Sequence, residues 1–208
     1  IISGLVGSEM CIRDSNLGCW LISDEVYHQI TFNNFVSPSF LQFSNPKDKL
    51  IVINSASKSF NMTGWRIGWI THPEELGSHI AKLVQITTTG VPEFLQNGLV
   101  SALENHKSIT NEIRKNLKKS RDIMFDRLVT WKKVECSIPE AAFYAFFKVE
   151  GIKDSLDFAK KLILETNVGV APGIAFGTSG EGHLRICFAA KESFINQIMD
   201  RLEPVLNR

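Results

Sequence analysis

The chain has 208 residues, of which 44% are hydrophobic and 22% charged, and its formal net charge is +1. This length fits one large domain or two small ones, and the composition excludes a disordered, collagen-like or disulfide-scaffold protein. The balanced charge predicts no nucleic-acid partner. No apolar run reaches the roughly 18–20 residues of a membrane-spanning helix, so no membrane partner is expected.

The first fifteen residues are predicted to be foreign to the natural protein. The stretch GLVGSEMCIRDS, from Gly4 to Ser15, resembles the translation of a sequencing-library adapter. Residues 1–15 are therefore set apart from the fold, as a processing scar would be. We expect the natural sequence to begin at Asn16, inside a longer protein, and the alternative of a genuine N-terminal loop stays open.

The first part of the chain contains three short apolar runs. They span Leu17 to Ser23, Leu50 to Asn54 and Trp65 to Thr71. Each is too short for a helix and lacks alternation, which is typical of strands covered on both faces in a parallel or mixed sheet. The stretch from Phe32 to Asn45 between them is predicted to be a loop.

Helical spacing follows. Pro73 begins one predicted helix and Pro92 another, which runs to about Glu104. Apolar residues from Ile109 to Trp131 keep helical spacing without a glycine, and a helix of that length could connect two domains.

The last part of the chain alternates between strand and helix. The expected order is a strand over Ala142 to Val149, a helix over Ser155 to Thr166, the segments NVGVAP and HLRICFA, and a final amphipathic helix. Together these elements predict an α/β chain whose last part is a small α+β unit.

Lys58 is the centre of the strongest candidate site. It follows a predicted buried strand in the stretch NSASKSFNMTGWRIGW, and Asp24 and Tyr27 follow another strand in SDEVY. Ligands bind at the carboxyl ends of parallel strands. A carboxylate there can pair with a protonated pyridine nitrogen, which makes the ring an electron sink. From these residues alone, a solvated lysine and a turn-capping aspartate remain possible.

These motifs resemble the class I and II aminotransferases that depend on pyridoxal phosphate, which are of fold type I and similar to aspartate aminotransferase. The resemblance covers residues 17–208 and includes PEAAFYAFF, GVAPGIAFG and GHLRICFA. It implies that residues 16–108 form the C-terminal part of the cofactor-binding large domain, with a mixed, mostly parallel sheet and flanking helices. Residues 109–208 would form a small C-terminal domain entered through a long helix.

The resemblance assigns a cofactor-binding role to five residues. Lys58 would form a Schiff base with pyridoxal phosphate and then move the α-proton of the substrate. Asp24 would face the pyridine nitrogen and Tyr27 the 3-oxygen of the ring. Ser55 and Arg66 would bind the phosphate, because an arginine donates two parallel hydrogen bonds to such an anion.

The substrate site is implied in the same way. Arg185, in GHLRICF, matches the arginine that binds the substrate α-carboxylate. The resemblance also implies that the N-terminal half of the family, with its share of the pocket, lies outside this sequence. The 208-residue polypeptide is therefore expected to be poorly folded or inactive when expressed alone.

The predicted activity is transamination between an amino acid and a 2-oxo acid. The residues around Lys58 favour an acidic amino acid such as aspartate, in a cytoplasmic protein that forms a homodimer at full length. Four scattered cysteines without a CxxC pair predict buried free thiols, and the histidines lack HExxH spacing for a metal. Two alternatives remain open, a pyridoxal-phosphate-dependent lyase of the same fold and the aminotransferase-like domain of a transcription regulator.

Overall fold

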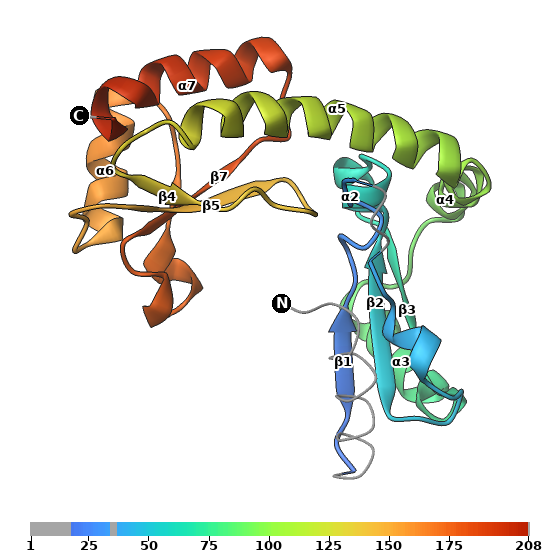
Figure 1. Cartoon of the computed structure of the whole chain (residues 1–208). Coiled ribbons are helices and arrows are strands. Elements are labelled where there is room, and N and C mark those ends of the chain that lie inside the picture. Colours follow the sequence, from blue (N-terminus) through green and yellow to red (C-terminus); the bar gives the residue numbers. More distant parts are fainter. Residues whose placement is uncertain (1–17, 34–36, 208) are drawn as a thin grey trace. The chain divides into compact units, whose positions relative to one another are not determined.

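The protein is described here by a computed structural model, which covers residues 18–33 and 37–207 (Figure 1). The predicted foreign segment, residues 1–15, lies outside these described residues. The contacts divide the chain into two compact units, residues 1–113 and 114–208. The boundary that the sequence predicts, at residue 109, stays a prediction.

The first unit contains a three-stranded mixed sheet. Its strands, in the order β1-β2-β3, are β1 (Leu21–Asp24), β2 (Leu50–Ser55) and β3 (Gly68–Thr71). β1 pairs with β2 in parallel, and β3 pairs with β2 in an antiparallel direction. The three predicted strands are present, but β1 and β3 begin several residues later than the apolar runs do.

Of the helices of the first unit, the one predicted after Pro92 begins as predicted, the one predicted at Pro73 begins as a 3₁₀ turn, and the short helix after β2 was not predicted. The helices are α2 (Ala56–Ser59), α3 (Gly77–Thr87) and α4 (Glu93–Glu104), with 3₁₀ turns η1 (Phe40–Phe43), η2 (Thr63–Trp65) and η3 (Glu74–Leu76). Pro73 and Pro92 occupy the N-cap positions of η3 and α4, where a missing N–H is tolerated. The expectation of strands covered on both faces is not met within the described residues, because Ile22 is 61% exposed.

The long predicted helix is α5 (His106–Leu128), which contains the boundary between the two contact units. It begins three residues earlier and ends three residues earlier than the apolar spacing from Ile109 to Trp131 indicates. A turn after Leu128 brings the buried Trp131 into the core of the second unit.

The second unit is a four-stranded antiparallel sheet with helices. The strands, in the order β4-β5-β7-β6, are β4 (Val134–Cys136), β5 (Tyr144–Val149), β7 (His183–Cys187) and β6 (Ala171–Pro172). The remaining elements are α6 (Ser155–Thr166), α7 (Glu192–Leu206) and the 3₁₀ turns η4 (Gly173–Phe176) and η5 (Thr178–Gly180). Figure 1 shows α7 running beside the C-terminal half of α5.

Two ion pairs hold α7 against α5. The Arg127 guanidinium binds the carboxylates of Asp200, at 2.6 Å, and Glu203. These two carboxylates hold the pKa of Arg127 above its ordinary value even though burial of the side chain lowers it. The contact joins two helices whose apolar faces form the core of the second unit, where Ile195, Met199 and Leu202 are fully buried.

The remaining expectations about the chain concern its thiols and membranes. Cys19, Cys136 and Cys187 are free, as predicted, but Cys19 and Cys187 are exposed, so the prediction that they are buried is wrong. Cys187 is the last residue of β7 and lies on the less buried face of that strand, opposite to the face of the buried Leu184 and Ile186. Within the described residues, no helix combines the length and the apolar character that crossing a membrane requires.

Candidate functional site

The site begins at the carboxyl ends of β1 and β2. Because the two strands are parallel, Asp24, the last residue of β1, pairs in register with Ile53, and Ser55 ends β2 two residues later. The Oδ1 atom of Asp24 accepts a hydrogen bond from the Val26 N–H at 3.2 Å. This contact fixes the carboxylate at the start of a turn and leaves Oδ2 to accept a donor from a ligand.

Lys58 lies in α2, one short helical turn after β2. Ser55 caps this turn, since its Oγ accepts a hydrogen bond from the Ser57 N–H at 3.1 Å. The Ser55 hydroxyl hydrogen can still donate to an anion. The buried Ser59 then connects α2 to the turn after β1, with its Oγ 3.5 Å from the Val26 carbonyl oxygen. The turn that carries Asp24 and the turn that carries Lys58 are thus neighbours.

Tyr27 lies in the same turn as Val26, partly buried, and its carbonyl oxygen accepts a hydrogen bond from the Ile30 N–H at 2.8 Å. The buried Glu25 stabilises this turn because its Oε1 accepts from the Ser23 hydroxyl and from the Phe40 N–H. The neighbouring His28 binds the Glu25 carbonyl oxygen and the Gln29 amide. These hydrogen bonds hold the His28 ring within the turn.

Arg66 has an unusual backbone. It adopts the left-handed conformation, with φ 51° and ψ 46°, at the end of η2. A non-glycine residue in this region costs on the order of 1 kcal/mol, and such residues gather at functional sites. Its Nη1 donates to the Thr63 carbonyl oxygen at 3.0 Å, while the Thr63 hydroxyl donates to the Ser57 carbonyl oxygen at 3.1 Å. Arg66 is therefore tied to the backbone of the lysine turn through one residue.

Apolar residues of this loop pack with residues of α4 in a small buried cluster. Its buried members are Ala56, Phe60, Ile67, Leu99 and Ala102. The Ala56 N–H also donates to the Ile67 carbonyl oxygen at 3.1 Å, which joins the start of α2 to the residue after Arg66. The loop that carries the polar residues is thus packed against α4 and continuous with the end of β2.

Glycines permit two close approaches at this site. A Cβ atom on Gly68, which pairs with Ser55, would lie 2.6 Å from the Asn54 carbonyl oxygen. A Cβ atom on Gly98 in α4 would lie 2.4 Å from the Trp65 ring. Both distances are too short for a real side chain, so these positions let β3 and α4 pack tightly around the loop.

Arg185 belongs to the second unit, in the middle of β7, where it pairs in register with Phe146 of β5. Its guanidinium carbon lies 4.3 Å from the centre of the Tyr144 ring and 4.2 Å from that of the Phe176 ring. Among the described residues, no oxygen accepts a hydrogen bond from Arg185. A cation held by rings, with its N–H groups still available, suits a carboxylate ligand.

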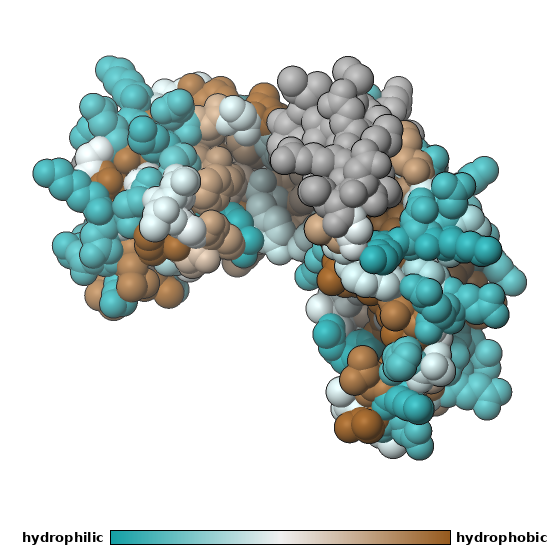
Figure 2. All heavy atoms as spheres, turned by 90° about the horizontal axis from the view of Figure 1, so that it is seen from below, coloured by the Kyte–Doolittle hydropathy of each residue, from teal (hydrophilic) through white to brown (hydrophobic). Residues whose placement is uncertain are grey.

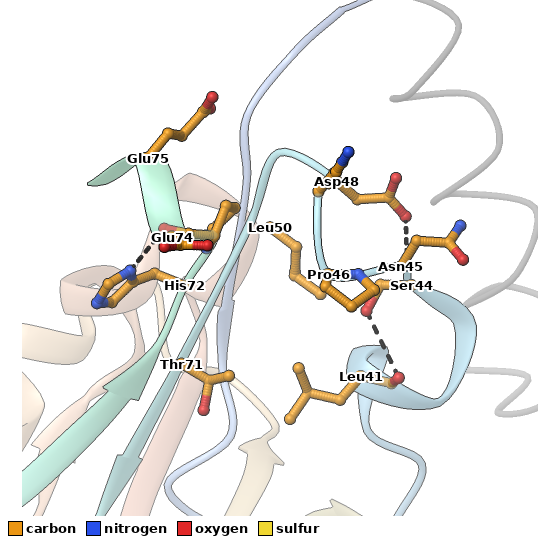
Figure 3. Close-up of a pocket in the computed structure, with 12 residues that line it drawn as sticks. Leu41, Ser44, Asn45, Pro46, Asp48, Leu50, Thr71, His72, Glu74 and Glu75 are labelled. Carbon is orange, nitrogen blue, oxygen red and sulfur yellow. Dashed lines mark hydrogen bonds between the residues drawn. The ribbon is translucent and has the colours of Figure 1, made fainter. Parts of the chain in front are cut away.

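A further pocket lies away from the lysine loop. It has a volume of about 710 Å³ and is lined by residues that precede β2 and follow β3, including Asp48, Leu50, Thr71 and His72 (Figure 3). Since Lys58 and Ser55 lie at the opposite end of β2, this pocket is separate from the lysine loop. Most of its polar groups make local contacts, such as the Asp48 carboxylate with the Asn45 N–H at 2.7 Å.

Comparison with known proteins identifies the fold and its family. The family model for aminotransferase class I and II matches residues 12–202. The chain belongs to this family. Class I and II aminotransferases use pyridoxal phosphate, and the resemblance seen in the motifs is therefore confirmed.

The individual proteins that the chain resembles are all named as aminotransferases. The chain is 35% identical to LL-diaminopimelate aminotransferase of Natranaerobius thermophilus, over 93% of this chain and 49% of the relative. It is 33% identical to aspartate aminotransferase of Thermotoga maritima, over 90% and 48%. An aromatic aminotransferase structure from Pyrococcus horikoshii matches with a TM-score of 0.91 and 28% identity, over 99% of this chain and 56% of that one. The chain thus spans about half the length of these relatives.

The predicted site residues therefore fall into two groups. Asp24, Tyr27, Ser55, Lys58 and Arg66 come together at one end of the first sheet, whereas Arg185 lies in the other unit. An amine, a carboxylate, a phenol, a hydroxyl and a guanidinium form a donor set that fits an aldehyde, a pyridine nitrogen and a phosphate. The described residues contain no group of three metal-ligating side chains. Sequence reasoning missed Tyr144 and Phe176 because only the fold brings them to Arg185.

Proposed function

We propose that the protein containing this chain exchanges an amino group between an amino acid and a 2-oxo acid. The observation that carries the proposal is the position of Lys58. It follows β2 in a loop that also contains Ser55 and Arg66, beside the turn that carries Asp24. Membership in the aminotransferase family supports the same reaction.

Each of the five residues then has a role in holding the cofactor. The Oδ2 atom of Asp24 would pair with the protonated ring nitrogen, and the Tyr27 hydroxyl would donate to the ring oxygen. Ser55 and Arg66 donate to the phosphate, where two charge-assisted hydrogen bonds from a guanidinium bind strongly. When bound, pyridoxal phosphate supplies an electron sink that stabilises negative charge on the amino acid α-carbon.

Lys58 and Arg185 act on the substrate. The Lys58 Nζ would hold the cofactor covalently, and its amine, once freed, would remove the α-proton of the substrate as a general base. Arg185 binds the α-carboxylate and so fixes which bond of the α-carbon faces the reaction centre. Both steps need water to be excluded from the site, because water weakens the ion pair and competes for the proton.

The choice of substrate rests on resemblance to the aspartate aminotransferase branch. We propose aspartate or another acidic amino acid as the amino donor, 2-oxoglutarate as the acceptor, and a cytoplasmic homodimer as the complete assembly. The similar proteins bear the names aspartate, diaminopimelate and aromatic aminotransferase. Product analysis with each class of amino acid decides among them, and a product regenerated without amino transfer would indicate a lyase instead.

The direct test replaces Lys58 in the longest natural polypeptide that contains residues 16–208. In the unaltered protein, borohydride reduction followed by peptide mass spectrometry should fix the cofactor on Lys58. Lys58→Ala should lose the visible absorbance of lysine-bound cofactor and at least about 1000-fold in transamination rate, since it removes both the attachment and the base. Lys47→Ala, an exposed lysine at the other end of β2, is the matched control and should keep both. Cofactor fixed on another lysine would refute the proposal.

A further inference from the structure

The rings around Arg185 form a defined arrangement. Tyr144 comes from β5 and Phe176 from the end of η4, and these two residues, 32 positions apart in sequence, meet at the same guanidinium. We call Tyr144 and Phe176 the aromatic pair. Each ring lies within the distance at which a cation is attracted to an aromatic face.

A second layer holds the aromatic pair in place. The Phe146 ring meets Phe176 edge-to-face, with ring centres 5.9 Å apart, and stacks on His183 with centres 4.9 Å apart and planes within 6°. Both Phe146 and His183 point to the same face of the sheet as Tyr144 and Arg185, because positions two apart on a strand share a face. Phe176 is thus supported by β5 and β7 rather than by η4 alone.

The backbone of η4 is itself fixed. The buried Ser155 hydroxyl accepts a hydrogen bond from the Ile174 N–H at 3.1 Å, and the Gly177 N–H donates to the Ile174 carbonyl oxygen. Gly173 and Gly180 approach so closely that a Cβ atom on either would lie about 2 Å from the other's backbone oxygen (1.9 and 2.2 Å). Phe176 therefore belongs to a turn whose backbone is fixed by contacts at both of its ends.

The aromatic pair holds the Arg185 side chain in one orientation before any ligand binds, and this lowers the free-energy cost of binding a carboxylate. An arginine side chain loses about 2 kcal/mol of rotamer freedom when it is fixed, and rings that fix it beforehand reduce the cost of binding. The rings also satisfy the cation without accepting its N–H groups in hydrogen bonds. Phe146 and Phe176 are both partly exposed, so a bound ligand would cover them as well.

We propose that Tyr144 and Phe176 are positioning residues, which hold the Arg185 guanidinium in the orientation that binds a substrate carboxylate. The proposal rests on the proposed function, in which Arg185 is the carboxylate-binding residue. It adds that the affinity for the carboxylate depends on two aromatic side chains that need not touch the ligand.

The test uses the longest natural polypeptide that contains residues 16–208, labelled with ¹⁵N-arginine, and succinate as the carboxylate probe. The Nε–H signal of Arg185 is identified by its loss in Arg185→Lys, and its change with succinate gives the affinity. In the unaltered chain this signal should be displaced from the position of a solvated arginine by the ring currents. Tyr144→Leu and Phe176→Leu should each return it towards that position and weaken succinate binding about three- to tenfold.

Two variants separate positioning from simple packing. Tyr144→Phe keeps the ring and should bind succinate within about twofold of the unaltered chain. Phe194→Leu makes the same exchange at an exposed phenylalanine of α7 that is not one of the rings described around Arg185, and should change neither the signal nor the affinity. If Tyr144 and Phe176 only filled space, a leucine in their place would preserve succinate binding and the Arg185 signal. A positioning role instead requires the aromatic ring.

The outcomes distinguish this inference from the proposed function. If Arg185→Lys binds succinate as tightly as the unaltered chain, the carboxylate role of Arg185 fails, and the positioning role fails with it. If Arg185→Lys loses binding while both leucine variants keep it, only the positioning role is overturned. An Arg185 signal at the solvated position in the unaltered chain would also overturn it, because the rings would then not hold the cation.

Discussion

The two compact units differ in how completely they bury their apolar side chains. Of the twelve largest side chains that are less than 2% exposed, eleven lie in the second unit and one, Ile30, lies in the first. In the first unit Ile86 is 82% exposed and Phe94 is 72% exposed, and in the second Leu164 is 85% exposed. Hydrophobic residues reach the surface in both parts of the molecule in Figure 2. The units thus differ in their fully buried large side chains, nearly all of which lie in the second unit, and not in whether they expose apolar side chains.

The proposed site residues are also divided between the two units. The five proposed cofactor-binding residues stand in the first unit on a small apolar cluster, and the proposed carboxylate-binding Arg185 stands in the second on a dense core. A fixed arginine needs a rigid sheet behind it, since a displacement of about 1 Å can reduce catalysis on the order of 100-fold. The lysine loop instead depends on local hydrogen bonds and on a strained Arg66 backbone.

The largest expected effect is a difference in amide hydrogen exchange between the units of the 208-residue chain. Amides of β5 and β7 should exchange on the order of 100-fold more slowly than those of β1 and β3, because they open only with the core of the second unit. β2, which is paired on both sides, should lie between them. Equal protection in β1 and β7 would show that the first unit is as stable as the second and would remove the contrast.

The sequence predicted most elements and the residues of the lysine loop. The observed bounds of α6, Ser155 to Thr166, are those that the sequence predicts, because Asp154 caps its first turn and apolar spacing ends at its last. β4 was missed because three residues, VEC, carry no pattern. Strand starts were placed early because apolar residues before β1 and β3 fill turns, such as the left-handed one at Arg66.

The site was only partly predictable for a related reason. A short motif such as SASK indicates a lysine loop because strand, cap and lysine are adjacent in sequence. The contact of Arg185 with Tyr144 and Phe176 depends instead on the register of β5 against β7 and on the fold of η4. Neither the register nor the turn follows from one sequence without the structure.

A second prediction concerns the close approach that anchors η4. Gly173→Ala places a Cβ atom 1.9 Å from the Gly180 carbonyl oxygen and 2.7 Å from that of His183, and neither backbone group can move freely. The variant should lose about 3 kcal/mol of unfolding free energy in the second unit, measured by urea unfolding with the indole NMR signal of Trp131. The matched control is Gly169→Ala, whose Cβ would meet only the Ile163 side chain at 3.9 Å, and it should change the same free energy by less than about 1 kcal/mol. Equal losses in the two variants would contradict this account.

The smallest expected effect is a pH dependence that belongs to the second unit. The Glu181 Oε1 atom accepts hydrogen bonds from the Gly182 N–H at 2.9 Å and the Ser155 N–H at 2.6 Å, beside the first turn of α6. The Gly182 N–H, followed by the hydroxyl and N–H of Ser155, lowers the pKa of Glu181 below its ordinary value of 4.5. A carboxylate with a lowered pKa stabilises the folded state above the unfolded pKa, and this stabilisation is lost as the pH falls through the folded pKa.

This loss should appear between about pH 5 and pH 3 as a decline in the unfolding free energy of the second unit. Glu181→Gln cannot ionise, so its decline over that range should be shallower than that of the unaltered chain. Glu150→Gln, at an exposed glutamate after β5, is the control and should keep the original slope. Because the same Ser155 holds the Ile174 N–H, the Arg185 signal should begin to move towards its solvated position over the same pH range. An unchanged slope in Glu181→Gln would mean that the carboxylate does not stabilise the turn that supports Phe176, and η4 would then depend on its glycine contact alone.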